Sequence, residues 1–460
     1  MKFTCFIPLI LISVCFWGCR KEDNITTDPS AKLEFSADTI LFDTVFTSTG
    51  STTQRIKVFN RGKRAVKIQE IKLGGGSSSN YQININGIAS HYAEGIEIRG
   101  NDSLNVFVKV TIDPSSDQLP FIVKDSIGFL TNGNYQKVVL TAYGQNAVFL
   151  NDALINTNTV WDSKLPYVIF NKVTVNPGRT LTIQRGTKLY FHKDAELIVA
   201  GTLKVEGAVE DSVSFLSDRL ERIYEDEPGQ WKGLHFLKSS KDNLINYGLI
   251  KNGTIGIQVD SLSENSTPKL LLVNSMIYNM ELIALYGRNA DVAAFNNVFA
   301  NCGKYLIYGV NGGRYNFKQN TLANLSFQFP RTTPSLFFTN QVSPGITSAF
   351  NLTLLNNIIW GSLPDELIVE KIGTMSFSQS IIKNLIKSRD LSLESSGNIL
   401  NTDPLFKNAR QNNFVLTSGS PAANKGENLI TDPYFNPWLK KDLAEKVRLF
   451  PSELGAYELL

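Results

Sequence analysis

The sequence is poor in the residues on which disulfide-stapled and many catalytic proteins depend. Its 460 residues include four Cys and three His, and three of the Cys fall within the first twenty positions. Cys302 is the only Cys beyond them, so an internal disulfide framework is excluded and Cys302 is expected to be a small buried residue. Lys and Arg number 45 against 42 Asp and Glu. A formal net charge of +3 lacks the basic excess of a dedicated nucleic-acid binder.

Long apolar runs are also missing after residue 18. Residues 1–18 read M-K-F-T-C-F-I-P-L-I-L-I-S-V-C-F-W-G, with one positive charge at Lys2 and the small Gly18 directly before Cys19. The apolar stretch is shorter than the roughly 20 residues of a membrane-spanning helix, and a charged run follows it at once. The pattern predicts a cleaved signal peptide over residues 1–18.

The residues around the expected cleavage point carry a resemblance to known export signals. Gly18 before Cys19 resembles the lipobox of bacterial lipoproteins, in which a cysteine becomes lipidated after cleavage. Lys21 followed by Glu22 and Asp23 is similar to the signal that sends surface lipoproteins of Bacteroidetes-type bacteria to the outside of the outer membrane. The resemblance implies a lipidated linker over residues 19–32, with palmitate-type acyl chains on Cys19. Because stable anchoring takes more than one chain, a multiply acylated terminus would tether the protein to the outer membrane.

Residues 33–146 alternate short apolar runs with clusters of Gly, Asn, Asp and Ser, and they show no helical period. The alternation is clearest in R-I-K-V-F-N and L-N-V-F-V-K-V-T-I, where apolar residues recur at every second position. Seven such segments predict a two-sheet β-sandwich; they span 33–46, 54–60, 65–73, 81–86, 104–112, 121–130 and 135–143. The phrases F-N-R-G-K-R-A-V-K-I, V-T-I-D-P and V-L-T-A-Y-G-Q resemble Ig-like domains of the ASPM, SPD-2 and Hydin type. That resemblance implies a spacer or recruitment module.

Residues 147–460 contain an Asn-rich phrase that recurs after short β runs. The phrase ends at Asn279, Asn301 and Asn324, in steps of 22 and 23 residues. A repeat of this length without helices can bury its apolar residues only by stacking each coil on its neighbours. The pattern predicts an all-β chain whose second domain, 147–460, is a parallel β-helix. The Asn residues at its bends are expected to form a structural ladder, because Asn tolerates left-handed backbone conformations.

The end of the chain resembles the right-handed parallel β-helix, or pectate-lyase-like, superfamily. The resemblance is carried by D-P-L-F-K-N at 403–408, N-F-V-L-T-S-G-S-P-A-A-N-K-G at 413–426 and L-G-A-Y-E at 454–458. It implies a carboxy-terminal cap that closes the coil stack. Such a cap is physically expected, since an open last coil would expose unpaired strand edges.

The catalytic sets of that superfamily have no convincing copy in this chain. His91, His192 and His235 are its three His, and none stands in the Gly-His-Gly of polygalacturonases, so they are expected to be structural or exposed coil residues. One acidic loop, S-D-R-L-E-R-I-Y-E-D-E-P-G, could offer carboxylates to Ca²⁺, which takes six to eight oxygen ligands. The candidate ligands are Asp218, Glu225, Asp226 and Glu227. Two Arg dilute the charge and favour a solvated loop, and beyond this Ca²⁺ the sequence indicates no cofactor.

The insert 327–350 interrupts the repeat and is rich in aromatic and turn residues. Its rings could stack on sugars, or they could pack on the flank of the helix. The leading hypothesis is therefore a lipid-anchored surface protein that binds or adheres to a polysaccharide, glycan or host surface component through the side of the β-helix. A polysaccharide lyase or glycoside hydrolase is the alternative of another class. A purely structural envelope protein is the third.

Overall fold

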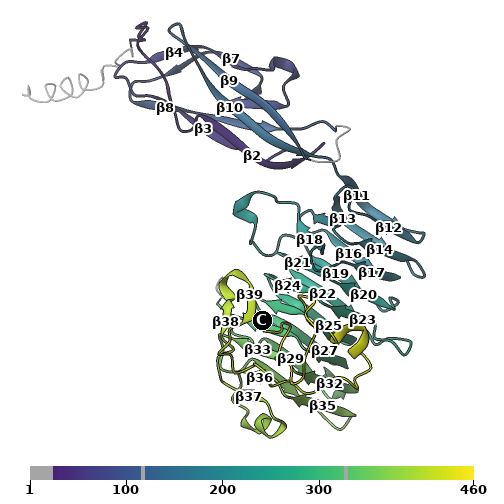
Figure 1. Ribbon diagram of the computed structural model, residues 1–460. Helices are drawn as coiled ribbons and strands as arrows, with labels where there is room; N and C mark the ends of the chain where they lie inside the picture. The colour runs from purple at the N-terminus through teal and green to yellow at the C-terminus, as the bar shows by residue number, and fades with distance from the viewer. Residues whose placement is uncertain (1–23, 115–119, 326–329, 460) are drawn as a thin grey trace, which may run out of the picture. The chain divides into compact units, whose positions relative to one another are not determined.

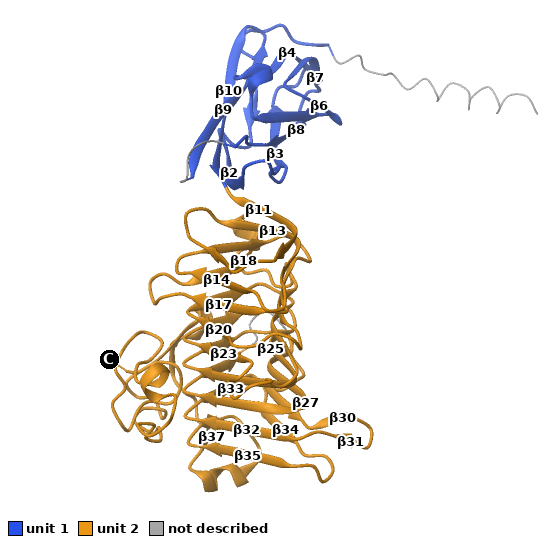
Figure 2. Ribbon diagram, turned by 90° about the vertical axis from the view of Figure 1, so that its right-hand side faces the viewer, with its two compact units in different colours: residues 1–146 blue, residues 147–460 orange. Residues whose placement is uncertain are grey.

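The computed structural model describes residues 24–114, 120–325 and 330–459 (Figure 1). The chain divides into two compact units, residues 1–146 and 147–460, which Figure 2 colours separately. The predicted signal peptide, Cys19 and the export signal Lys21, Glu22 and Asp23 lie outside the described residues. Within those that are described, no helix has both the length and the apolar character to cross a membrane.

The first unit is a sandwich of two five-stranded sheets with a closed apolar core, as predicted. One sheet has the strand order β1 (Glu34–Phe35), β3 (Gln54–Asn60), β8 (Asp102–Val110), β5 (Tyr81–Ile85) and β6 (Ile88–Ser90). The other has the order β2 (Thr39–Phe46), β10 (Asn134–Gln145), β9 (Phe121–Thr131), β4 (Val66–Leu73) and β7 (Tyr92–Ile98). In the central strands, such as β3, β5 and β8, alternate residues point into the core, which is why the period of two predicts most strands of the sandwich.

Two strands of this sandwich were missed by the sequence reading. The edge strand β6 has no buried residue, and β7 buries only Ile98 at its end. An edge strand that faces solvent on both sides carries no alternating apolar signal, so pattern reading passes over it.

The second unit is a parallel β-helix whose coils contribute in turn to three faces, here named sheets A, B and C (Figures 1 and 2). The first coils are built from β11 (Val148–Ile155), β12 (Thr159–Trp161) and β13 (Tyr167–Val175). Sheet A continues through β15 (Lys188–Phe191), β18 (Val213–Ser217), β21 (Gly248–Lys251), β24 (Met276–Tyr278), β26 (Val298–Ala300), β28 (Thr321–Asn324), β33 (Ile358–Gly361), β36 (Leu385–Ile386) and β37 (Ile399–Leu400). Sheet B continues through β16 (Glu196–Val199), β19 (Gly233–Phe236), β22 (Ile255–Asp260), the first halves of β25 (Ile283–Phe295) and β27 (Tyr305–Lys318), β29 (Leu336–Thr339) and β34 (Leu367–Glu370). Sheet C contains β14 (Thr180–Gln184), β17 (Thr202–Glu206), β20 (Asn243–Asn246), β23 (Leu270–Val273), the second halves of β25 and β27, β32 (Phe350–Leu355) and β35 (Phe377–Ile382).

The interior is filled by columns of aliphatic residues that stack from coil to coil. One column of sheet B runs in register through Leu197, Leu234, Ile257, Leu285, Ile307, Leu336 and Leu367. Its members are all buried. Fully burying such a side chain contributes about 1.5–3 kcal/mol, and each coil can do so only with a neighbour above and below.

The Asn residues form a ladder, but its continuous part lies at a different bend from the predicted one. Between sheets C and A, the amides of successive coils are hydrogen-bonded at 3.0 Å in a buried row. This row consists of Asn297, Asn320, Asn357, Asn384 and Asn398.

The predicted ladder residues follow sheet A instead. Asn279 and Asn301 have φ of 59° and 50°, as expected for Asn at a tight bend. Their side-chain amides donate to Asn252 and Asn412 at 2.6 and 2.9 Å, and the Asn324 side chain accepts from the Cys302 N–H at 3.0 Å. The repeat step alone could not separate the two bends, because both carry Asn at the same spacing.

The carboxy-terminal segment, residues 403–459, is named the strap; it does not close the end of the coil stack. Its apolar residues pack on the outward sides of sheets A and C, including Phe414 on Val298, Ala300 and Ala323. The last coil is instead flanked by the short helix η3 (Leu391–Ser396), whose Leu393 packs on the core. The expected cap is thus a lateral cover, because the outer face of sheet A is apolar over many coils.

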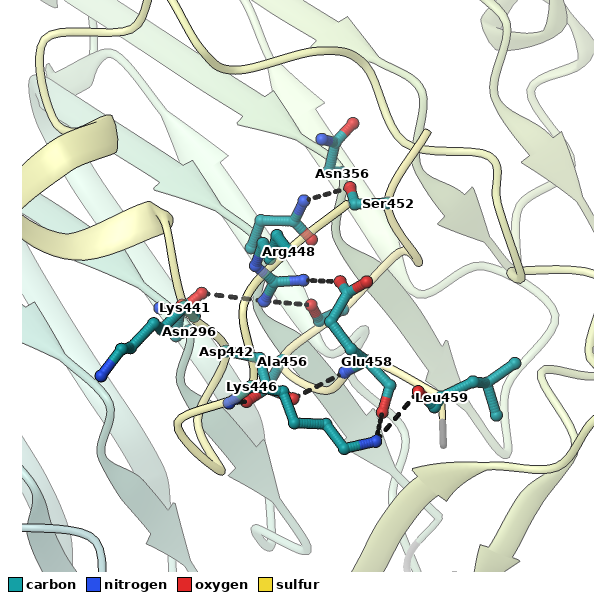
Figure 3. A network of polar contacts seen from close by, with 12 residues as sticks. Asn296, Asn356, Lys441, Asp442, Lys446, Arg448, Ser452, Ala456, Glu458 and Leu459 are labelled. Atoms are coloured by element: carbon teal, nitrogen blue, oxygen red, sulfur yellow. Dashed lines mark hydrogen bonds and ion pairs between the residues drawn. The ribbon is translucent and has the colours of Figure 1, made fainter. Parts of the chain in front are cut away.

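A buried polar network fixes the end of the strap to the helix (Figure 3). Arg448 donates one hydrogen bond to the Glu458 carboxyl and another to the Asn296 side chain, the latter at 2.9 Å. The Glu458 N–H donates to Asp442 at 2.7 Å. Burial, together with the neighbouring Glu453 carboxyl, raises the pKa of Glu458 to about 8.

Only part of the segment 327–350 departs from the regular path of the coils. Residues 336–339 form the regular strand β29, with Phe338 in the core and Phe337 on the outside. The part that departs from the coil path is the hairpin of β30 (Gln341–Ser343) and β31 (Ile346–Thr347) (Figure 2). The insert is anchored by Arg331, whose side chain is fully buried against Glu366.

Candidate functional site

The outward side of sheet B is the candidate functional surface. The strap joins sheets A and C through its apolar clusters, whereas the outward residues in the middle of sheet B remain partly accessible to solvent. One outward row runs in register over five coils, through His235, Gln258, Tyr286, Tyr308 and Phe337. Parallel strands lie about 4.8 Å apart, so the row extends over roughly 19 Å.

Four aromatic rings form one half of this surface. Tyr286 and Tyr308 have ring centroids 5.6 Å apart and stack at 26°. Tyr308 lies 5.6 Å from Phe337 and 4.6 Å from Tyr305, which stands on the same strand three positions earlier. Coil register stacks Tyr286, Tyr308 and Phe337, and Tyr305 at the start of β27 joins them through its ring contact with Tyr308. Together the four rings form a continuous, partly exposed apolar platform.

Burial raises the pKa of Tyr305 and of Tyr308, with Glu370 adding to the rise in both. The two phenols therefore stay uncharged at neutral pH. A neutral phenol offers a flat apolar ring and a hydroxyl that both donates and accepts hydrogen bonds.

Polar groups form the other half of the surface. His235 Nε2 lies 2.8 Å from the Asp260 carboxylate and 3.1 Å from the Gln258 amide nitrogen. Arg288 approaches the other carboxylate oxygen of Asp260 at 3.5 Å. These side chains hold one another in place beside the aromatic platform, so the surface combines ring faces with fixed donors and acceptors.

A shallow hollow of about 160 Å³ lies next to His235. Glu196, Lys232 and Thr254 line it together with His235 and Gln258. Gly233 is required in its floor, because its φ is 135° and a Cβ there would meet the Ile255 carbonyl oxygen at 1.7 Å. The hollow therefore places a carboxylate, an ammonium group and an imidazole around one small space.

The acidic loop does not assemble a metal site. Asp218 is paired with His192 at 2.6 Å, and Asp226 faces Lys251 at 3.7 Å. In the parts of the chain that the structure describes, no group of three or more His, Cys, Asp or Glu side chains is arranged to hold a metal ion. The predicted candidates Asp218, Glu225, Asp226 and Glu227 thus remain four separate positions of a loop.

His192 and His235 both belong to the β-helix, but their surroundings differ. His192 is half-exposed at a bend, with its ring 5.1 Å from Phe170. His235 stands in the outward row of sheet B, and the third, His91, precedes β7 of the sandwich. Cys302 is fully buried, and burial raises the pKa of its thiol to about 12, so this thiol stays protonated.

Only Phe337 of the aromatic platform belongs to the insert 327–350, whose rings the sequence indicates as candidates for stacking on sugars. Tyr286 and Tyr308 were not predicted, although the sequence carries a signal for them. The phrases A-L-Y-G-R and L-I-Y-G-V place Tyr286 and Tyr308 at corresponding positions 22 residues apart, the same step as the Asn phrase. Phe337 lacks such a signal, since the inserted residues before it break the spacing.

Comparison with known proteins adds little to this picture. No protein-family model matches the chain, and no curated protein matches its sequence. Among solved structures, a family 123 glycoside hydrolase from Clostridium perfringens is 12% identical over 26% of each chain, with a TM-score of 0.20. The PapD-like domain 7 of human CEP192 is 13% identical over 27% of this chain and 90% of that one, with a TM-score of 0.18. The catalytic domain of a GH87 alpha-1,3-glucanase is 8% identical over 73% of this chain and 84% of that one, with a TM-score of 0.18.

Proposed function

We propose that the protein is a lipid-anchored surface protein that binds a polysaccharide chain along the outward side of sheet B. The observation that carries the proposal is the in-register row of Tyr286, Tyr308 and Phe337, which remains partly exposed and which no strap residue covers in the apolar clusters of the described chain. Rows of aromatic rings that stay accessible on a soluble surface mark interaction sites.

The chemistry of the row suits a carbohydrate. A sugar ring has an apolar face of C–H groups that packs on an aromatic ring, and an equatorial rim of hydroxyls that needs donors and acceptors. The platform provides the aromatic rings for this contact. Gln258, Asp260 and Arg288 provide the hydrogen-bond donors and acceptors for the hydroxyls. A length of roughly 19 Å accommodates several consecutive sugar units rather than a single one.

The anchor is proposed from the sequence. Cys19 would carry the lipid, and Lys21, Glu22 and Asp23 would direct the protein to the exterior of the outer membrane. Metabolic labelling with palmitate should mark the protein and should fail for Cys19→Ala. Protease treatment of intact cells should remove it; a protein that is cleaved only after cell lysis would contradict surface display.

A second candidate function is cleavage of the bound polysaccharide. It is favoured by the hollow beside the row, where His235 is held by Asp260 and faces Glu196 and Lys232. Acid–base catalysis needs a titratable group held in such a fixed orientation. Incubation with uronate polymers, with and without Ca²⁺, would decide for a lyase if unsaturated products appeared, and release of reducing ends from neutral polymers would decide for a hydrolase.

The binding function is tested by a panel of soluble and insoluble polysaccharides. The protein should bind at least one of them, and Tyr308→Ala should weaken that binding at least tenfold by removing the central ring. Tyr135→Ala, an exposed tyrosine of the sandwich, is the matched control and should bind normally. A Tyr308→Ala protein that binds as well as the unaltered chain would refute the assignment of this surface.

A further inference from the structure

A second hollow lies on a different side of the β-helix, on the outward side of sheet C. It has a volume of about 250 Å³ and is open to solvent on one side. Its walls come from the loop before β23, from β25, β27 and β32, and from Tyr434 of the strap. This volume is below the range of roughly 300–1,000 Å³ that is usual for pockets of drug-sized ligands. It is thus suited to a single small ring.

The polar groups of this hollow are fixed by the coil register. Asp291, Arg314 and Asn351 stand in one row on successive coils, and Ala293 and Asn316 stand in the next row. Because Ala293 has no side chain beyond Cβ, the space above it stays open between the two rows. The register, rather than a mobile loop, therefore sets the positions of the charged and amide groups.

Asp291 and Arg314 form an ion pair at 2.6 Å. The Asp291 side chain is 11% exposed, and burial raises its pKa despite the pairing. The Asp291 carboxyl accepts hydrogen bonds from Arg314 Nη2 and from the Ser263 backbone N–H. The Arg314 side chain lines the hollow and is 52% exposed, so its guanidinium can also donate to a ligand. The pair presents an acceptor and several donors side by side with no net charge.

Asn316 adds an acceptor that lacks a protein partner. Its Oδ1 is shielded from solvent, and among the residues that the structure describes it has no hydrogen-bond partner. A shielded carbonyl oxygen without a partner costs free energy comparable to a lost hydrogen bond. Because the Asn316 residue lines the hollow, a rotation of its amide would let Oδ1 accept a hydrogen bond from a ligand hydroxyl.

The strap supplies the apolar wall. Tyr434 lines the hollow, and its ring centroid lies 4.7 Å from that of Phe295. The strap is held there by the ion pair of Asp432 with Lys318, whose ammonium group also lies 5.9 Å from the Tyr434 ring centroid. The wall is therefore a positioned aromatic ring.

From this arrangement we infer that the hollow binds one uncharged, hydroxyl-rich ring, such as a single sugar unit or a cyclic polyol. Asp291 and Asn316 accept from its hydroxyls, Arg314 donates to its oxygens, and Tyr434 contacts its apolar face. An anion would meet the Asp291 carboxylate, and a cation would compete with Arg314, so the paired charges select a neutral ligand. This site does not depend on the proposed function of sheet B.

Titration with free monosaccharides, followed by calorimetry and by ligand-observed NMR, tests the site. The probes are glucose, galactose, mannose, fucose and N-acetylglucosamine. At least one should bind with a millimolar dissociation constant, and it should raise the melting temperature of the protein at saturation. Ser266→Trp places a large side chain at the exposed rim without touching the buried groups and should weaken binding more than tenfold. Asn316→Leu should weaken it several-fold, because it removes the unpartnered acceptor.

Glu264→Trp is the control on the same loop, since Glu264 is exposed and does not line the hollow. Tyr308→Ala is the control on sheet B. Both should bind the monosaccharide as the unaltered protein does. Absence of binding by every probe, or binding that survives Ser266→Trp, would overturn the inference, whereas loss of binding in Tyr308→Ala would move the monosaccharide to sheet B.

Discussion

Sheets A and B are two faces of the same β-helix, built from the same coils, and their outward sides are opposite in character. In the coils of β26 and β28, sheet A carries the small apolar residues Val298, Ala300 and Ala323, and the strap buries them completely. In earlier coils, the outward residues Tyr190, Leu216 and Leu249 of sheet A remain partly exposed. Sheet B carries large rings such as Tyr286 and Tyr308, which remain partly exposed. The strap-covered part of sheet A thus contributes to stability, whereas sheet B is the face for which we propose ligand binding.

This difference means that the same kind of substitution should have different consequences on the two faces. On the covered face, a change in a buried side chain leaves a cavity or an unpaired charge and lowers the free energy of unfolding. On the bare face, a change removes a contact to the ligand and leaves the fold nearly intact. Three stability measurements probe this contrast.

The largest effect is expected at Arg331, which anchors the insert before β29. Its side chain is fully buried, and it donates to the two carboxylate oxygens of Glu366 at 2.8 and 2.5 Å. Arg331→Met should lower the free energy of unfolding by about 3–5 kcal/mol, because the Glu366 charge is left buried without its partner. Denaturant unfolding measures the loss.

The control for Arg331 is Arg288→Met on sheet B. Arg288 is 54% exposed and 3.5 Å from Asp260, and a surface pair of this kind contributes about 1 kcal/mol or less. The double variant Arg331→Met/Glu366→Leu should recover part of the loss. Equal destabilisation by Arg331→Met and Arg288→Met would contradict the contrast.

A second, smaller effect is expected for matched phenylalanines. Phe414 of the strap is buried on sheet A, and Phe337 is half-buried on sheet B. Phe414→Ala should cost about 3 kcal/mol, near the lower end for a buried Phe, while Phe337→Ala should cost about 1 kcal/mol or less. Thermal unfolding of the two variants side by side gives the comparison, and the contrast fails if the order is reversed.

A third effect concerns pH and the strap. The folded-state pKa of Glu458 is raised from 4.5 to about 8, so the folded protein binds a proton that the unfolded chain has released over that interval. The corresponding stability is fully present below pH 4.5 and is lost as the pH rises through about 8. The melting temperature should therefore fall by a few degrees across this range.

Glu453→Gln removes the neighbouring carboxyl and should flatten that pH dependence. Glu453 contributes to the raised pKa of Glu458 both by hydrogen bonding and by charge. A melting temperature that rises from pH 5 to pH 8 in the unaltered protein would show that Glu458 is ionised in the folded state over this interval.

The fold could be predicted because its signals are local and repeated. The period of two identifies strands that bury one side, and the Asn phrase gives the coil length, so the sandwich and the stack of coils both follow from the sequence. Edge strand β6 could not be found, since none of its residues is buried. The position of the strap could not be predicted either, because the motif L-G-A-Y-E does not indicate whether the strap packs on the end or on the side of the β-helix.

Only part of the candidate site could be predicted from the sequence, because the 22-residue step relates Tyr286 to Tyr308 but no spacing relates Phe337 to them. Tyr308 and Phe337 are 29 positions apart, and only the register of β27 with β29 brings them to 5.6 Å. Loops of different lengths separate successive coils, so spacing does not determine which outward residues become neighbours. The acidic loop shows the reverse case: its carboxylates are close in the sequence, but in the described structure they do not converge on a common metal site.

The central claim is that the aromatic row of sheet B binds a polysaccharide, and the double variant Tyr286→Ala/Tyr308→Ala tests it most directly. Its dissociation constant for the polysaccharide selected by the unaltered protein should be measured together with its melting temperature. The account predicts a loss of affinity well above tenfold with a melting temperature within a few degrees of the unaltered protein. Unchanged affinity in a folded double variant would contradict it.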